Sequence, residues 1–422
     1  MTQTANQQTT TYLVGGAVRD ELLGIAPRER DWVVTGSTPE ELLRQGYRQV
    51  GASFPVFLHP QSGEEYALAR TERKQGHGYH GFTVDFHPGV SLQEDLARRD
   101  LTINAMARGE GGQLVDPYGG QQDLEQRILR HVSPAFTEDP LRVLRVARFA
   151  ARFAQLGFTV HPATMDLMRQ IAASGELAHL VAERTWAELA GGLATPRPSV
   201  FVQILRDCAA LAWILPEVDC LFGTPQDERY HPEIDTGLHV QMALDFAAAR
   251  EWSSEVRFAL LLHDLGKGQT ARADWPAHHD HESTGLPLVR AVCERLRAPV
   301  VFRDLALHVC ALHLRCHRAL ELRPASLLSV LEEADLLRRP ERLESFLQAC
   351  EADYCGRKDR TEKPYPQAAR VREALQAALA VKVATLEVSG LSGEEIGKKL
   401  RVARVEAIGM LPLGSAEGDT PA

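Results

Sequence analysis

The stretch "LVGGAVRDELLG" (residues 13–24) decides the fold of the first third of the chain. An apolar run ends in Gly15-Gly16 and a segment with helical periodicity follows directly, which predicts a strand, a tight turn and a helix. Paired glycines at such a turn let backbone amides approach an anion at the helix N-terminus. Arg19, one turn into the expected helix, could add a charge-assisted hydrogen bond. Taken alone, the pattern equally fits a glycine pair that only permits close packing.

The next apolar run, "RERDWVV" (residues 28–34), opens with two carboxylates, Glu29 and Asp31. Residues i and i+2 of a strand share a face, so both side chains are expected to point the same way. Like charges so placed repel unless a cation lies between them, and Mg²⁺ takes oxygen ligands while leaving room for substrate phosphates. Two such ions would serve a displacement at phosphorus. The alternative is a solvated strand end with Arg28 and Arg30 as counterions.

Composition and length bound the possible classes of protein. A chain of 422 residues is too long for one ordinary core, so two to four domains are expected. Its 44% hydrophobic and 24% charged residues are typical of a globular protein, and the longest apolar runs are too short for a membrane span. The polar start lacks a secretory signal, and seven cysteines without a CxxC pair indicate free thiols. These features predict a cytoplasmic protein with no membrane partner.

The pattern of apolar residues along the sequence changes near residue 138. Before it, short strand-like runs such as "EEYALAR" and "FTVDF" alternate with helical stretches, which predicts a small α/β head. After it, long segments with a 3.6-residue period predict a helical body. The Gly-, Pro- and charge-rich segment 223–235 is expected to be a joint, and the tail 412–422 to be disordered.

The glycine turn followed by a carboxylate pair resembles the nucleotidyltransferase head of the DNA polymerase β-like superfamily. The resemblance implies a third carboxylate on a neighbouring strand, for which Glu65 has the right setting, whereas Glu64 would face the opposite side. Two further blocks, "DLARRDLTINAMA" (95–107) and "EDPLRVLRVARFAAR" (138–152), match motifs of class II tRNA nucleotidyltransferases and bacterial poly(A) polymerases.

The resemblance implies catalysis by Asp31, Glu29 and Glu65, with Mg²⁺ held by Glu29 and Asp31. The family usually has Asp-x-Asp where this chain has Glu29-Arg30-Asp31. Glutamate is one methylene longer, so it can still ligate Mg²⁺ but must retract, and metal affinity or rate is expected to differ.

The same resemblance implies a nucleotide site. Arg99, with Asp100 beside it, would contact the sugar and phosphates, and Asp139 and Arg142 would hydrogen-bond the Watson–Crick edge of incoming CTP or ATP. Arg145 and Arg148 would hold the triphosphate or the base. The residues expected to bind ATP or CTP are Gly15, Gly16, Arg19, Arg99, Asp100, Asp139, Arg142, Arg145 and Arg148.

Helical geometry supports the second arginine block. At 100° per residue, Arg142, Arg145, Arg148 and Arg152 fall within about a 120° sector, with small apolar side chains opposite. Only two acids lie between residues 127 and 152, so a local basic surface is expected despite the net charge of −9.

A second site is expected in the helical half. "RFALLLHDLGKG" (257–268) sets His263-Asp264 at the end of an apolar helix that Gly266 is expected to close, although a lone His-Asp pair also fits a structural hydrogen bond. With His239 upstream and Asp353 downstream, the order resembles that of the HD-superfamily metal-dependent phosphohydrolases. Imidazole with carboxylate suits Ni²⁺ or another divalent transition metal better than Mg²⁺.

The metal ligands expected in this domain are His239, His263, Asp264 and Asp353. His278, His279 and His281 are left with two alternatives, which are contact with the substrate phosphate or a place in a solvated loop.

The match to the family runs from about residue 12 to 355 and is close to CCA-adding enzymes of the gammaproteobacterial type, which carry an extra hydrolase domain. The resemblance implies an α+β fold with a polymerase β-like α/β head and a mostly α-helical body that contains an HD domain. The expected parts are a head (1–137), a helical neck with the tRNA-binding surface (138–225), the HD domain (226–355) and a helical C-terminal segment (356–422).

The resemblance implies an enzyme that adds and repairs the 3′-terminal CCA of tRNA from CTP and ATP without a nucleic-acid template, releasing pyrophosphate. The HD domain would add phosphatase, 2′-nucleotidase and 2′,3′-cyclic phosphodiesterase activity. A monomer is expected, with a dimer as the alternative. Two other functions stay open: a poly(A) polymerase with the same head, and an HD phosphohydrolase with an inactive head, to which Glu29 is the one hint.

Overall fold

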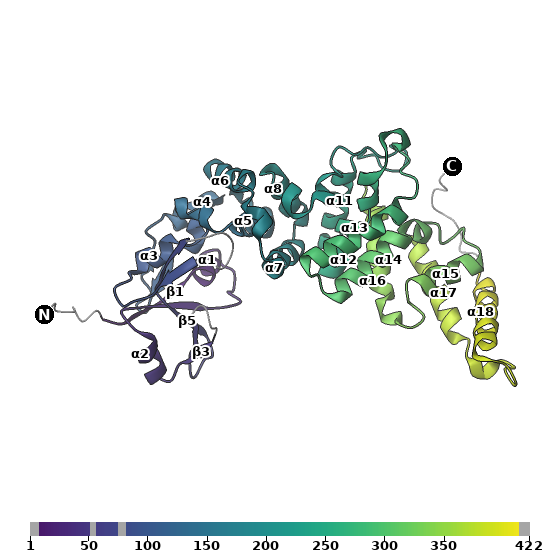
Figure 1. The fold of residues 1–422 in the computed structure, drawn as a ribbon, viewed down its shortest axis with the longest axis horizontal. Coiled ribbons are helices and arrows are strands. Elements are labelled where there is room, and N and C mark those ends of the chain that lie inside the picture. Colours follow the sequence, from purple (N-terminus) through teal and green to yellow (C-terminus); the bar gives the residue numbers. More distant parts are fainter. Residues whose placement is uncertain (1–7, 51–55, 75–81, 413–422) are drawn as a thin grey trace. The chain divides into compact units, whose positions relative to one another are not determined.

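The computed structural model describes residues 8–50, 56–74 and 82–412. The chain forms two compact units, of which the first comprises Met1–Glu188 and Gln203–Ile214 and the second Leu189–Val202 and Leu215–Ala422. The strands belong to the first unit, whereas helices build the second (Figure 1). This architecture confirms the predicted α+β fold with a sheet-containing head and a mostly helical body.

The head is built on a seven-stranded sheet in the order β3-β4-β5-β2-β1-β8-β9. Neighbouring strands are antiparallel except β2 and β5, which run parallel. The strands are β1 (Thr10–Val14), β2 (Asp31–Thr35), β3 (Arg48–Val50), β4 (Val56–Leu58), β5 (Glu65–Leu68), β8 (Ala107–Gly109) and β9 (Leu114–Val115). Two-stranded sheets are formed by β6 (Thr71–Lys74) with β7 (Phe82–Asp85), and by β10 (Ile128–Leu129) with β11 (Thr159–Val160).

Strand β2 is buried on both faces, because its side chains alternate between two cores. Val33 packs in a cluster with Leu96 of helix α3 (Leu92–Ala97), whereas Val34 packs with Leu42 of helix α2 (Pro39–Arg44). Asp31 has the same parity as Val33, so it points to the α3 face at the point where the strand begins.

The first unit also contains helices that follow the sheet or connect its strands. They are α1 (Gly16–Leu22), α4 (Gly120–Gln126), α5 (Arg142–Phe153), α6 (Pro162–Ala173) and α9 (Leu211–Ile214). Helices α7 (Ala182–Leu193) and α8 (Pro198–Asp207) each contribute residues to both units.

The second unit is arranged around helix α12 (Ser254–Leu262). Its residues 258–262 are completely buried, as expected for a helix that is apolar on all sides. The remaining helices of the unit are α10 (Pro216–Asp219), α11 (Thr236–Ala249), α13 (His281–Leu296), α14 (Val300–His317), α15 (Pro324–Glu333), α16 (Leu343–Cys355), α17 (Pro366–Ala380) and α18 (Gly393–Gly409).

Two local expectations are corrected by the fold. The segment 223–235 is no joint, because it lies wholly inside the second unit, where Thr224 and Gln226 are buried. Gly266 does not close α12, since the helix ends at Leu262 and a 3₁₀ turn from Leu265 to Gln269 follows. A Cβ at Gly266 would lie 1.9 Å from the carbonyl oxygen of His281, so the glycine allows the start of α13 to approach this turn.

Two further expectations concern the tail and the membrane. The predicted disorder of the tail falls on residues 413–422, which lie outside the described part of the chain. Among the described residues, no helix combines the length and apolar character that crossing a membrane requires.

Candidate catalytic and metal sites

The glycine turn of the head holds an arginine. Gly15 precedes α1 with φ +69°, and its N–H donates to the Met106 carbonyl oxygen at 3.1 Å. A Cβ at Gly15 would lie only 2.6 Å from Arg99 Nη1. The turn therefore needs glycine both for its backbone conformation and for the approach of Arg99, which places the arginine-rich block beside the first strand.

The structure distinguishes the two candidate glutamates. Asp31 and Glu65 are register partners in the parallel pair β2–β5, so their side chains share one face. Glu64 Oε2 instead accepts a hydrogen bond from Trp32 Nε1 at 3.2 Å, on the other face. Asp31 and Glu65 thus lie side by side on exposed strand starts, in the geometry the sequence predicted for Glu65.

The position of Glu29 differs from the prediction. Strand β2 begins at Asp31, so Glu29 lies in the irregular segment before it and the i, i+2 rule of a strand does not place its side chain. Glu29 is nonetheless close enough to raise the pKa of Asp31. Partial burial raises that pKa most, and Arg99 opposes both effects.

The head offers few carboxylates for a metal ion, which suits Mg²⁺, an ion that keeps several water or phosphate ligands, better than an ion bound only by protein side chains. Within the described residues, no set of three acidic, His or Cys side chains in the head brings its ligand atoms within 4.8 Å of one another. Two carboxylates, Asp31 and Glu65, with Glu29 nearby leave the positions that Mg²⁺ usually fills with water and substrate phosphates.

Asp100 connects the two arginine blocks. Its Oδ2 accepts a hydrogen bond from Arg145 Nε at 2.8 Å, while Oδ1 accepts from the Leu101 N–H and from Asn104 Nδ2. Burial favours the neutral acid, but Arg145 and these hydrogen bonds together hold the pKa of Asp100 well below its usual range. Asp100 therefore holds an arginine of α5 against the segment that carries Arg99.

The arginines of α5 are neutralised by distant acids. Arg145 and Arg148 both contact Glu188 of α7, at 3.6 and 2.9 Å, and Arg152 contacts Asp20 of α1 at 2.9 Å. The charge balance counted along residues 127–152 therefore omits acids that the fold brings in, and the expected basic surface stays a prediction. Glu188, a buried carboxylate that no sequence motif indicated, is an acid within an otherwise apolar run, "WAELAGGL".

The pair predicted to read the base is held by the protein. Arg142, 9% exposed, donates from Nη1 to the Ala135 carbonyl at 2.7 Å and from Nη2 to the Arg98 carbonyl. Asp139 Oδ2 accepts from Arg184 Nη2 at 3.0 Å. Both side chains are thus held by hydrogen bonds within the protein, and their role in base selection stays a prediction.

Arg19 has a different position from the one expected. It is 3% exposed, donates to Asp20 Oδ1 and Asn104 Oδ1, and lies over the rings of Phe149 and Phe153. Its guanidinium therefore joins α1 to Asn104 by a hydrogen bond and to α5 by cation–π contacts. This position fits a structural role better than a phosphate contact.

In the second unit, the predicted metal ligands meet at the end of α12. His239 Nε2 of α11 lies 3.1 Å from Asp353 Oδ1 of α16, although the two residues are 114 positions apart. His263 Nε2 lies 3.8 Å from the same oxygen and 3.2 Å from Asp264 Oδ2. All four side chains are at most 2% exposed, so nitrogen and carboxylate donors converge in a buried cluster.

A second cluster shares Asp264 with the first. His281 Nε2 at the start of α13 and His313 Nε2 of α14 lie 3.4 and 3.7 Å from Asp264 Oδ1. Among the described residues, this buried oxygen has no hydrogen-bond partner, although buried carboxylate oxygens normally have one. The unsatisfied oxygen between two imidazoles fits a divalent transition metal, and the N/O donor set favours Ni²⁺, Co²⁺, Mn²⁺ or Fe²⁺ over Mg²⁺.

Two buried cations accompany the carboxylates. Lys267 Nζ donates to Asp264 Oδ2 at 2.7 Å, and Arg357 Nη2 donates to Asp353 Oδ1 at 3.1 Å. Burial opposes ionisation of both acids, yet the surrounding cations and imidazoles hold their pKa values well below the usual range. Both carboxylates are therefore expected to be ionised at neutral pH, as metal ligation would require.

The three histidines with open alternatives have three different environments. His278 is buried and hydrogen-bonded to the Pro225 carbonyl oxygen and Thr270 Oγ1, whereas His279 is exposed. His281 is buried in the second cluster, which excludes the solvated loop, and its contact with the substrate phosphate stays a prediction. His317 is a further residue that no sequence motif indicated, and its Nε2 lies 2.7 Å from Asp353 Oδ2.

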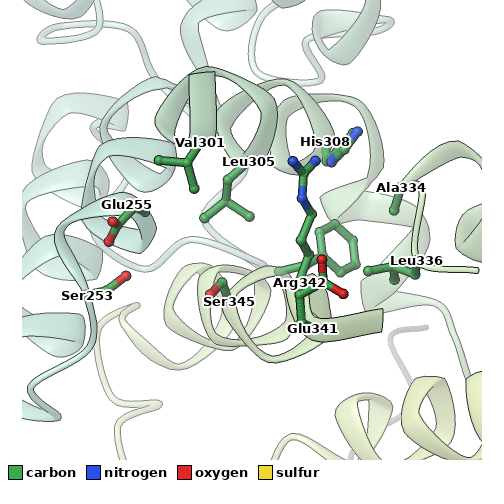
Figure 2. A pocket seen from close by; sticks show the side chains of 11 residues that line it. Ser253, Glu255, Val301, Leu305, His308, Ala334, Leu336, Glu341, Arg342 and Ser345 are labelled. Atoms are coloured by element: carbon green, nitrogen blue, oxygen red, sulfur yellow. The ribbon is translucent and has the colours of Figure 1, made fainter. Parts of the chain in front are cut away.

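A cavity of about 460 Å³ opens elsewhere in the second unit, between the first turns of α12 and α16 and the side of α14 (Figure 2). Val301, Leu305 and Phe346 are apolar residues of its lining. Arg342 extends toward His308 (Figure 2). None of the residues that line it belongs to the two clusters, so the cavity is separate from both of them.

The fold and the two sites define the class of protein: a polymerase β-like nucleotidyltransferase head combined with an HD domain. Family models match as "Poly A polymerase head domain" at residues 11–130, "Probable RNA and SrmB- binding site of polymerase A" at 157–221 and "HD domain" at 236–355. The multifunctional CCA protein of Hahella chejuensis is 57% identical over 397 residues, which is 94% of each chain. The chain belongs to the family of multifunctional CCA proteins.

Solved structures share the fold at lower identity. The Bacillus stearothermophilus CCA-adding enzyme in complex with CTP matches with a TM-score of 0.65 and 24% identity, over 95% of this chain and 89% of that one. The Thermotoga maritima CCA-adding enzyme complexed with tRNA matches with a TM-score of 0.60 and 18% identity, over 96% of this chain and 88% of that one. At these identities the likeness supports the fold alone.

Proposed function

We propose that the head transfers nucleotides to the 3′ end of tRNA at Asp31 and Glu65, which restores the CCA end from CTP and ATP and releases pyrophosphate. The observation that carries this site is the register pairing of the two carboxylates on one face, beside Gly15 and Arg99. A divalent cation such as Mg²⁺, when bound there, would activate the terminal hydroxyl and neutralise the leaving pyrophosphate. Glu29, whose charge acts on Asp31, is proposed to add a ligand or a water contact.

The nucleotide is proposed to bind between the glycine turn and α5. Arg99, held at the turn, supplies a guanidinium for the phosphates, and Asp100 keeps Arg145 in place by their hydrogen bond. Arg142 and Asp139 would then present donor and acceptor atoms to the Watson–Crick edge, which suits C and A and rejects G and U. The hydrogen bonds of Arg142 to backbone carbonyls and of Asp139 to Arg184 support side chains that are held in fixed positions for base recognition.

The second unit is proposed to be a metal-dependent phosphohydrolase with phosphatase, 2′-nucleotidase and 2′,3′-cyclic phosphodiesterase activity. His239, His263, Asp264 and Asp353 would hold one divalent transition metal such as Ni²⁺. Asp264 with His281 and His313 would offer a second position. The family-model match to an HD domain over residues 236–355 supports this activity. A hydrolase of this kind would clear damaged 3′ ends before nucleotides are added.

The remaining expectations are kept as proposals. tRNA is the polynucleotide partner, which the family-model match at 157–221 supports, and ATP joins CTP as substrate. The chain is proposed to act in the cytoplasm as a monomer, with a dimer as the alternative. The divisions at residues 137 and 355 are kept as proposed domain limits, whereas the one at residue 225 falls inside the second unit. The Thermotoga maritima enzyme binds tRNA and the Bacillus stearothermophilus enzyme binds CTP, which supports both as ligands of this chain.

A poly(A) polymerase with the same head is the nearest competing function, and one incubation separates the two. With ATP alone and an RNA that is not a tRNA, we expect no extension, because the nucleotide site works on a tRNA end. The RNA carries a label, and gel electrophoresis measures its length after the incubation. Unlimited adenylate addition would establish the poly(A) alternative and contradict the proposal.

A further inference from the structure

Glu233 is a buried carboxylate at the end of the segment 223–235, and it touches a proposed metal ligand. Its Oε1 lies 2.9 Å from His239 Nδ1 and 3.2 Å from His231 Nδ1. Its Oε2 accepts a hydrogen bond from the backbone N–H of Lys358 at 3.3 Å. The side chains of Glu233 and His239 are 3% and 0% exposed, so water does not compete for these contacts.

The contact determines which nitrogen of His239 carries the proton. A carboxylate at Nδ1 favours the tautomer with Nδ1–H, which leaves the lone pair of Nε2 free for a metal. Nε2 is the atom that faces Asp353 Oδ1 at 3.1 Å. Glu233 thus orients the ring toward the cluster at the end of α12.

Glu233 also connects α11, which carries His239, with the end of α16, which carries Asp353. Lys358 follows the ligand Asp353 by five positions, just beyond the end of α16. Arg357 makes a parallel connection, because its Nη1 donates to the Tyr230 carbonyl oxygen and its Nη2 to Asp353 Oδ1. The segment 223–235 is therefore attached twice to the ligand-bearing end of α16.

The backbone beside Glu233 is held in an unfavourable conformation. Ile234, a β-branched residue, has φ +62°, a region that such residues rarely adopt. The Ile234 carbonyl oxygen accepts from the Gln226 N–H at 2.7 Å, and Asp235 accepts from the N–H groups of Gly223 and Leu238. Strain of this kind persists only where the surroundings over-determine it, and it is frequent next to functional sites.

We infer that Glu233 is a positioning residue for the metal centre: it sets the tautomer and the orientation of His239 and fixes α11 to the end of α16. The inference rests on the proposed metal-dependent phosphohydrolase. It also gives the segment 223–235 a function, namely to deliver this carboxylate to the ligand.

Direct metal binding by the full-length chain tests the inference. We compare wild type with Glu233→Ala and Glu233→Gln, and with Glu228→Gln as the matched control, because Glu228 is an exposed carboxylate of the same segment. Titration calorimetry gives the Kd for Ni²⁺, and the absorption spectrum of added Co²⁺ reports the geometry of its ligands. Both Glu233 variants are expected to bind Ni²⁺ about 10- to 100-fold more weakly with an altered Co²⁺ spectrum. Glu228→Gln is expected to match wild type.

Thermal unfolding and CTP incorporation into tRNA verify that each variant is folded. If Glu233→Ala fails these checks, the near-isosteric Glu233→Gln decides. Folded variants with the wild-type Kd and Co²⁺ spectrum would overturn the inference, even if their melting temperature is lowered, since only a structural role would remain. Wild-type protein that binds no Ni²⁺ would instead overturn the proposed hydrolase centre and the inference with it.

Discussion

Replacing Asp31 by alanine is expected to lower the rate of CTP incorporation into tRNA that lacks its CCA end by roughly 1,000-fold, since metal stabilisation of the developing charge contributes several kcal/mol. Asp31 begins strand β2 beside Glu65 and projects from the face that carries Arg99. Single-turnover incorporation of labelled CTP at saturating tRNA measures the effect. The ligand-free fold should not suffer, because the raised pKa of Asp31 shows that its charge is unfavourable in the folded state.

Glu64→Ala is the matched control for this prediction. Glu64 is one residue from Glu65 but is hydrogen-bonded to Trp32 on the opposite face. Its removal should leave the incorporation rate within about twofold of wild type, as is usual for residues that do not touch the reacting atoms. Equal activity of Asp31→Ala and wild type would refute the assignment of the catalytic site.

Replacing Asp264 by alanine is expected to abolish hydrolysis of 2′,3′-cyclic phosphates, with a loss of at least about 1,000-fold, because one carboxylate serves both clusters. Ni²⁺-dependent release of product from a cyclic nucleotide measures the loss, and metal content after dialysis shows its origin. CTP incorporation by the head provides the internal control.

Asp264→Ala is also expected to lower the stability of the second unit. Asp264 is paired with the buried Lys267, and removal of one partner of a buried pair costs about 3–5 kcal/mol of the free energy of unfolding. Asp264→Asn keeps a hydrogen-bond acceptor for Lys267 but lacks the ligand charge, so it should fold better and still fail to hydrolyse. Wild-type hydrolysis by a folded Asp264→Asn protein with normal metal content would contradict the proposed centre.

The sequence predicts the parts of both sites that are encoded by short motifs. Gly15, Asp31 and the His263-Asp264 pair each stand next to an apolar run whose period gives the strand or helix, so their place at the end of an element follows from local patterning. The prediction of Glu65 also needed the family resemblance, which implies a third carboxylate on a neighbouring strand. The alternation of faces along a strand then places Glu64 and Glu65 on opposite sides.

The residues that the sequence does not reveal are brought in by tertiary contacts. Glu188 and Asp20 neutralise arginines of α5 from helices that a window around residue 145 does not include. Glu233 lies in a segment whose Gly, Pro and charge content is typical of a linker, although its backbone is fixed by hydrogen bonds. Neither kind of residue has a local periodicity that could indicate its burial.

The predicted position of Glu29 depended on where strand β2 begins. The same-face geometry of Glu29 and Asp31 depended on both residues lying in β2, and the strand begins only at Asp31. Strand starts are uncertain by a few residues because solvated ends lack a packing partner. Glu65 rather than Glu29 is therefore the carboxylate whose position beside Asp31 follows from the register of the sheet.

The most direct test of the central proposal is labelled CTP and ATP supplied separately to tRNAs that end at the discriminator base, at C or at CC. We predict that CTP extends the first two substrates up to CC, that only ATP extends the third by a single A, and that Asp31→Ala extends none. Incorporation that ignores the 3′ end, or none at all from a folded wild-type protein that still hydrolyses cyclic phosphates, would contradict the account.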